Sequence, residues 1–306
     1  MKIVVIGPTL LTRKCVEALI RKGERISAIY TLDDSLALGK SRFAIMDDFA
    51  EKNIPLYKVK DINSPEVIEQ IRKINPDLIF ELGWSQIISP DILKIPGKGC
   101  IGVHASLLPK NRGAASLNWA LIRGDKKTGV TLFYLAEKPD DGDIIAQKEF
   151  DIDDRDDIAT LHCKSDDASV QLILENIDLI RSGTAKRIRQ DPKQVTFTTR
   201  RKPEDGIIDW SRPARDIYNW IRAQTHPFPG AFTFWKGKKI YAWTAEPMNG
   251  SGRPGEIISI EAKRGVLVGT GDGTILLKRI QIEDGVEMWA DDFAERHDIK
   301  QGDILG

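Results

Sequence analysis

The sequence predicts an α/β protein in which a parallel sheet is followed by a smaller, β-rich domain. Two observations predict this. In the first part, short apolar runs that indicate strands alternate with helical segments, which is typical of a parallel sheet joined by crossover helices. In the last hundred residues, short strands recur between turns rich in Gly and Pro, which favours a small barrel or sandwich. A chain of 306 residues, 41% of them hydrophobic, is long enough for both.

The elements of the first part follow each other in the expected rhythm. Ser64 is a good N-cap, because its hydroxyl can accept a hydrogen bond from a free backbone N–H, and Pro65 is tolerated at the first helical position. Strands are expected at 2–7, 26–31, 54–59, 77–82 and 100–104, and helices at 11–22, 41–52 and 65–74.

The second part begins with a strand, a long helix and a basic, polar segment. Ser211 is expected to cap a helix that starts the C-terminal domain. We therefore expect a catalytic domain at 1–190, a linker at 191–205 and a C-terminal domain at 206–306. The strand at 144–152 and the helix at 158–181 are followed by a helix at 211–224 and by strands at 233–235, 239–243, 256–260, 265–269 and 274–282.

Charge and composition limit the possible functions. Lys+Arg and Asp+Glu both number 45, so the net charge is zero, which argues against a protein whose main role is to hold nucleic acid. Three dispersed cysteines and four histidines, without a CxxC motif, favour neither a disulfide framework nor a metal site. No signal peptide or membrane span is evident, so we expect a cytoplasmic protein.

The stretch from 100 to 143 holds the best candidates for chemistry. His104 ends an apolar strand, and an acidic turn with Asp140, Asp141 and Asp143 follows the next strand. Because ligands bind at the carboxyl ends of parallel strands, a carboxylate there could fix the tautomer of the histidine and leave one nitrogen for proton transfer. The alternative is a histidine that only satisfies a buried polar turn.

The same stretch resembles a known family. The runs HASLLPKNRGAASLNWAL, TGVTLFYL and DDGDI are similar to those of formyltransferases that use 10-formyltetrahydrofolate, whose acceptors include methionyl-tRNA and nucleotide-linked amino sugars. The later stretch IIDWSRPARDIYNWIRAQTHPFPGAF resembles the start of that family's C-terminal domain. The resemblance implies a Rossmann-like domain, a small open β-barrel of the oligonucleotide/oligosaccharide-binding type, and attack of a substrate amine on the formyl carbon of the folate.

The resemblance assigns the catalytic residues with one departure. His104 and Asp140 match the family's His and Asp, but Gly102 stands where the family has an Asn whose amide can stabilise the oxyanion. Three interpretations stay open. Another donor, such as His104, a water, Gln86 or Asn111, supplies the hydrogen bond; or the chain binds its ligands with weak or no formyl transfer; or the space serves a different donor or reaction.

The resemblance also implies the residues that bind the two ligands. Arg112 suits a phosphate or carboxylate, although a structural salt bridge is the alternative for this residue. The donor is expected to contact Trp84, Gln86, Ile87, Ile88, Pro139 and Asp140, and the acceptor Ser106, Arg112 and Asn118.

Two acceptors compete. The tRNA enzymes carry a basic insertion where this chain has the short region 31–49, which has no basic excess, and the net charge is zero. We therefore favour a nucleotide-linked amino sugar, with nucleic acid an unlikely partner and a homodimer possible. The alternative is methionyl-tRNA, which the basic segment 186–202 keeps open because tRNA affinity depends on phosphate contacts.

Overall fold

The computed structural model describes residues 1–37 and 42–306, which form two compact units. The first contains 1–116, 128–150 and 163–199, and the second contains 117–127, 151–162 and 200–306. Most of the segment expected as a linker, 191–205, thus belongs to the first unit: β9 (Phe197–Thr198) pairs in parallel with β6 (Arg112–Gly113).

The first unit is built on a seven-stranded sheet with the order β3-β2-β1-β4-β5-β7-β8. β1 to β5 run parallel, and β7 is antiparallel to β5. The chain moves outward from β1 to β3 and then returns to place β4 on the other side of β1, which makes the β1/β4 edge the switch point where such sheets bind ligands. The strands are β1 (Lys2–Ile6), β2 (Arg25–Leu32), β3 (Leu56–Val59), β4 (Leu78–Glu81), β5 (Cys100–His104), β7 (Lys127–Tyr134) and β8 (Ile144–Asp151).

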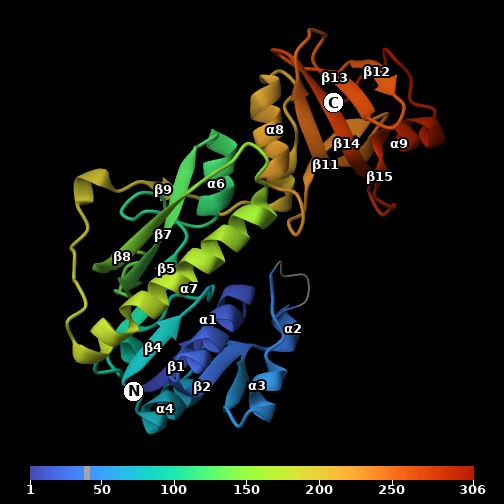
Figure 1. Ribbon diagram of the computed structural model, residues 1–306. Helices are drawn as coiled ribbons and strands as arrows, with labels where there is room; N and C mark the ends of the chain where they lie inside the picture. The colour runs from blue at the N-terminus through green and yellow to red at the C-terminus, as the bar shows by residue number, and fades with distance from the viewer. Residues whose placement is uncertain (38–41) are drawn as a thin grey trace. The chain divides into compact units, whose positions relative to one another are not determined.

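Helices cover both faces of this sheet, as the alternation within β1 requires. Ile3 and Val5 pack with apolar residues of α1 and α7, whereas Val4 and Ile6 face those of α4 and α5. Figure 1 shows α1 and α7 on the same side of the strands. The helices of the first unit are α1 (Leu10–Arg21), α2 (Asp34–Ala37), α3 (Asp47–Glu51), α4 (Pro65–Ile74), α5 (Pro90–Leu93) and most of α7 (Ile158–Ser182), whereas α6 (Ser116–Arg123) belongs almost wholly to the second unit.

Local signals explain where these helices begin. Ser64 caps α4, because its hydroxyl accepts a hydrogen bond from the N–H of Val67, and this confirms the prediction. The helix expected at 41–52 is much shorter. Its first residue lies outside the described part of the chain, residues 42–46 are not helical, and only Asp47–Glu51 forms α3.

The second unit is a separate antiparallel sheet with the order β10-β11-β14-β13-β12, to which β15 adds beside β14. The sheet is open: among the strand pairings of the described residues, none joins β10 to β12. Ser211 does not cap the helix as expected. It bonds back to Asp209, and α8 begins at Ala214. The elements of this part of the second unit are η2 (Pro203–Gly206), α8 (Ala214–Arg222), β10 (Ala231–Trp235), β11 (Lys238–Met248), β12 (Ile257–Glu261), β13 (Gly265–Gly269), β14 (Thr274–Ile282), β15 (Met288–Trp289) and α9 (Ala290–His297), whereas η1 (Pro192–Gln194) belongs to the first unit.

None of the helices in the described ranges is both long enough and apolar enough to span a bilayer.

Candidate active site

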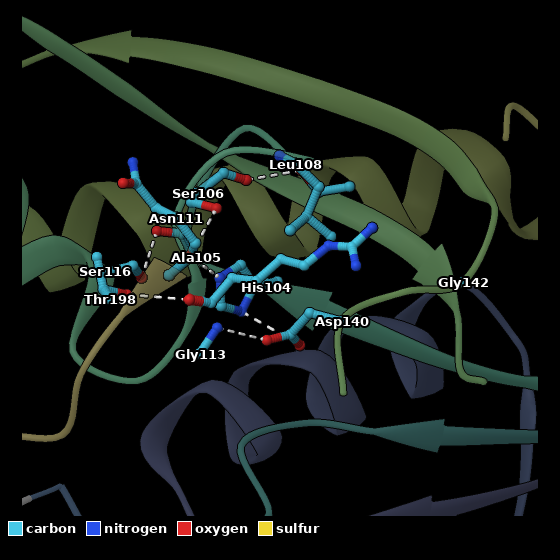
Figure 2. Close-up of polar contacts among 12 residues, drawn as sticks. His104, Ala105, Ser106, Leu108, Asn111, Gly113, Ser116, Asp140, Gly142 and Thr198 are labelled. Carbon is cyan, nitrogen blue, oxygen red and sulfur yellow. Dashed lines mark hydrogen bonds and ion pairs between the residues drawn. The ribbon is translucent and has the colours of Figure 1, made fainter. Parts of the chain in front are cut away.

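His104 ends β5 at the carboxyl edge of the sheet, where the sequence predicts it. Its Nε2 lies 2.7 Å from the carbonyl oxygen of Asn111, and its Nδ1 lies 3.6 Å from Oδ1 of Asp140 (Figure 2). A carbonyl only accepts, so Nε2 carries the proton and Nδ1 is the basic nitrogen of the neutral ring. The tautomer is therefore fixed by Asn111, and the basic nitrogen faces Asp140.

Asp140 is held by the backbone around it. The N–H of Gly113 donates a hydrogen bond to Oδ2 of Asp140, which Figure 2 marks with a dashed line. The distance is 2.8 Å, and Asp140 has a left-handed φ of 54°. Two residues later, a Cβ on Gly142 would lie 1.7 Å from the carbonyl oxygen of Tyr134. The acidic turn therefore requires glycine at position 142. This turn places Asp140 beside His104.

Gln190, which is distant in the sequence, stabilises the acidic turn by hydrogen bonds. Its Nε2 donates to the carbonyls of Asp140 and Gly142, both at 2.8 Å, and its Oε1 accepts from Nε and Nη2 of Arg112. Arg112 is 7% exposed and also pairs with Asp141 at 2.5 Å. The salt bridge that the sequence left open as an alternative for Arg112 is thus present, and contact with a substrate stays a prediction.

The other two residues assigned to the acceptor are engaged in hydrogen bonds within the protein. The Ser106 hydroxyl donates to the carbonyl of Lys110 at 2.7 Å, and its own carbonyl accepts from Thr131 at 2.6 Å, so it shapes the loop after β5. Asn118 belongs to the second unit, where its amide donates to the carbonyl of Ala223 at 2.7 Å. Their contact with an acceptor remains a prediction.

The loop after β4 carries the residues assigned to the donor. Gln86 fixes this loop: its Oε1 accepts from the N–H of Ile62 at 3.0 Å and from the indole N–H of Trp84 at 3.2 Å, and its Nε2 donates to the carbonyl of Lys60. The Gln86 amide is therefore engaged in the loop. Trp84 and Ile88 are buried, whereas Ile87 and Pro139 are exposed.

A carboxyl group that the sequence analysis did not single out lies beside Gly102. Glu81 pairs with Gly102 across β4 and β5, so both face the same side of the sheet as His104. A Cβ on Gly102 would lie 2.8 Å from Cδ2 of Leu135 and 3.3 Å from Oε2 of Glu81. A side chain at 102 would therefore require the end of the Leu135 side chain to move, and its Cβ would press closely on the carboxyl group of Glu81.

The environment of Glu81 favours its protonated form. Burial raises the pKa of Glu81 to about 7, and the negative charge of Asp140 acts in the same direction, although backbone N–H groups of Trp84 and Gly83 oppose it. The N–H of Trp84 donates to Oε1 at 2.5 Å. A signal was present in the sequence, since Glu81 is the single acidic residue near the carboxyl end of the apolar strand 78–82.

Together these residues can move a proton and stabilise negative charge. Nδ1 of His104 can accept a proton, and the carboxylate of Asp140 at 3.6 Å stabilises the imidazolium that results. Glu81 adds a carboxylic acid that can donate a hydrogen bond near neutral pH. Such a set suits acyl transfer to an amine.

Proteins of known structure share the fold. HypX from Aquifex aeolicus in complex with tetrahydrofolic acid matches with a TM-score of 0.69 and 19% identity, over 96% of this chain and 47% of that chain, so this chain spans about half of HypX. WlaRD, a sugar 3N-formyl transferase whose structure contains dTDP and 5-N-formyl-THF, matches with a TM-score of 0.68 and 18% identity, over 94% of this chain and 99% of that chain.

Relatives in sequence correct the preferred acceptor. A methionyl-tRNA formyltransferase from Citrifermentans bemidjiense is 35% identical over 100% of this chain and 96% of its own length, and four further relatives at 32–34% bear the same name. The preference for an amino-sugar acceptor is therefore wrong. It depended on the absence of a basic insertion at 31–49 and on the zero net charge, and it gave too little weight to the basic segment 186–202.

Family profiles agree with these relatives along almost the whole chain. The profile described as formyl transferase matches residues 1–177, and that of the formyl transferase C-terminal domain matches residues 200–298. Both the antiparallel C-terminal sheet and the histidine at the end of β5 lie within the matched ranges. The chain belongs to the formyl transferase family.

Proposed function

We propose that this protein transfers the formyl group of 10-formyltetrahydrofolate to the amino group of methionyl-tRNA. The observation that carries the proposal is the identity of 32–35% along the whole chain to five methionyl-tRNA formyltransferases. The site supports it, because a histidine with a fixed tautomer and a carboxylate partner stands where the strands of the sheet end.

The residues of the site suit the proton movements of this reaction. The amine nitrogen bonds to the formyl carbon, and the bond from that carbon to N10 of the folate breaks with its electron pair going to N10. The amine loses one proton and N10 gains one. Nδ1 of His104 takes the proton from the amine and returns it to N10, while Asp140 stabilises the intermediate imidazolium.

An exposed basic segment supports a tRNA acceptor. The side chains that precede β9 include four positive charges that face solvent, namely Lys186, Arg187, Arg189 and Lys193. The basic segment is followed in the sequence by β9, and β9 pairs with β6. Gly113 of β6 donates a hydrogen bond to Asp140, so the segment ends close to a residue of the site. Phosphates neutralised by such residues would make tRNA binding depend on salt.

The test is formylation of charged initiator tRNA. Purified protein, 10-formyltetrahydrofolate and methionyl-tRNA should give formylmethionyl-tRNA, and His104→Ala should lower the rate by about 10²- to 10⁴-fold, the usual contribution of general acid–base catalysis. A matched control is the exposed Glu51→Gln, which should keep the full rate. No product from the wild-type protein, with an active formyltransferase as positive control, would refute the proposal.

The basic segment is tested by the salt dependence of tRNA binding. Replacing Lys186 and Arg189 together with Ala should weaken binding and reduce the slope of log K against log salt by about 1 to 2. An unchanged slope would show that these side chains do not contact phosphate.

A further inference from the structure

We propose that Glu81, as a carboxylic acid, donates a hydrogen bond to the formyl oxygen while negative charge develops on it. This inference rests on the proposed function. Attack on a formyl carbon creates a tetrahedral oxyanion, and a donor placed for that oxygen is usually the largest single contribution of an acyl-transfer site. The expected donor, an Asn amide at position 102, is absent, because that position is glycine.

Geometry places Glu81 in the required position. It ends β4 and pairs with Gly102, and residues two apart on a strand face the same side, so Glu81, Gly102 and His104 share one face at the ligand-binding edge. Oε2 of Glu81 lies 3.3 Å from the point where a side chain at 102 would start. The carboxyl group of Glu81 thus lies beside the position that an Asn would occupy, on the face of the sheet that also carries His104.

The hydrogen bonds of Glu81 fix its orientation. The N–H of Trp84 donates to Oε1, which makes Oε1 an acceptor and directs Oε2 toward Gly102. Gln86 holds the indole of Trp84 and the backbone of Ile62, so the loop that supplies this N–H is itself anchored. A donor that is already oriented needs no reorganisation when charge develops.

The surrounding charges favour the acid form that donation requires. Asp140 from the turn after β7 and the thiol of Cys100 from β5 interact electrostatically with Glu81, and the backbone N–H groups of Gly83 and Trp84 face it from its own loop. His104 stands on the same face and is paired with Asp140. Burial, the largest effect, raises the pKa of Glu81 to about 7, so about half of the molecules carry this proton at pH 7 and more of them do at lower pH.

During the transfer Glu81 keeps its proton. The bond between nitrogen and the formyl carbon forms, the bond to N10 breaks, and His104 carries the one proton that passes from the amine to N10. Glu81 only hydrogen-bonds the oxygen, most strongly in the tetrahedral intermediate, and no oxidant or further reactant is needed. The arrangement resembles other sites in which a buried neutral carboxylic acid stabilises an oxyanion.

The first test compares three side chains at position 81 in single-turnover formylation of methionyl-tRNA between pH 6 and 9. Glu81→Ala should lower the rate about 10²- to 10³-fold, as for loss of one oxyanion donor, with little change in the KM for the folate. Glu81→Gln keeps a donor that does not ionise, so it should retain activity and lose less rate than the wild type above pH 7. Glu51→Gln is the matched control. A rate of Glu81→Ala within about threefold of the wild type would overturn the proposal.

The second test does not require turnover. Infrared difference spectra of the full chain should show a protonated carboxyl band that Glu81→Gln removes and that shifts when 10-formyltetrahydrofolate is added without methionyl-tRNA. A shifted band without formylation of methionyl-tRNA would refute the proposed acceptor and support the role of Glu81. Formylation by the wild type with an unshifted band would refute the role of Glu81 and leave the proposed function standing.

Discussion

Replacing Glu81 with Gln should change how stability depends on pH, independently of catalysis. In the folded protein burial raises the pKa of Glu81 to about 7, from an ordinary value of 4.5. At about 1.4 kcal/mol per pKa unit, this difference corresponds to about 3 kcal/mol in favour of the protonated folded state. The wild-type protein therefore carries a penalty at high pH that a neutral Gln side chain avoids.

The sign follows from proton binding in the two states. Below about pH 4.5 Glu81 is protonated in both the folded and the unfolded chain, so pH has no effect through this group. Between about 4.5 and 7 the folded state holds more protons than the unfolded state, and the free energy of unfolding falls as pH rises. Above about 7 the full penalty of about 3 kcal/mol remains.

Urea unfolding at several pH values between 4.5 and 8.5 measures this effect. The free energy of unfolding of Glu81→Gln minus that of the wild type should grow by up to about 3 kcal/mol between pH 5 and pH 8, whereas titrations elsewhere cancel in the difference. Gln keeps an oxygen that can accept from the N–H of Trp84. Glu51→Gln, at an exposed site, should give a constant difference, and a constant difference for Glu81→Gln would refute the reasoning.

Two further predictions concern the same site. Gly102→Asn should destabilise the protein by about 1–3 kcal/mol, because the new Cβ would lie 2.8 Å from Cδ2 of Leu135. Thermal melts check this. An unchanged Tm would show that Leu135 moves aside without cost. Gln190→Ala should lower the free energy of unfolding by about 2–4 kcal/mol, because two carbonyls of the acidic turn and the buried Arg112 lose the hydrogen bonds that Gln190 makes to them. It should also lower the formylation rate. Thermal melts and rate assays check this, and a normal rate in a destabilised protein would contradict the link between Gln190 and Asp140.

The regular elements could be predicted from the sequence because local patterns determine them. The apolar strand 100–104 and the capped helix 65–74 appear with the expected bounds. The helix expected at 41–52 is mostly wrong, because apolar spacing alone does not distinguish a helix from a turn that packs on a sheet. Ser211 was expected to cap α8, but Asp209 accepts its hydroxyl and so removes it from that role.

The site was predictable only where one short motif carries it. His104 and Asp140 both come from the stretch 100–143, and the structure brings them together. Gln190 could not be found in this way, because its partner Arg112 is 78 residues away in the sequence and glutamine is common in polar segments. Glu81 gave a weak signal, since a lone acid in an apolar strand has meaning only once its neighbour on the next strand is known.

The pairing of β4 with β5 changes how the missing amide should be interpreted. Considered alone, Gly102 indicates a lost function, because glycine has no side-chain donor. Considered with its neighbours, the glycine is what leaves room for Leu135 and for the carboxyl group of Glu81 on the same face. A side chain at 102 would crowd Leu135 and press on the carboxyl group of Glu81, so a substitution at 102 also changes the surroundings of Glu81. Introducing an amide by Gly102→Asn is therefore expected to disturb Glu81, the donor that is already present. Only variants at position 81 remove this donor without adding a side chain beside it.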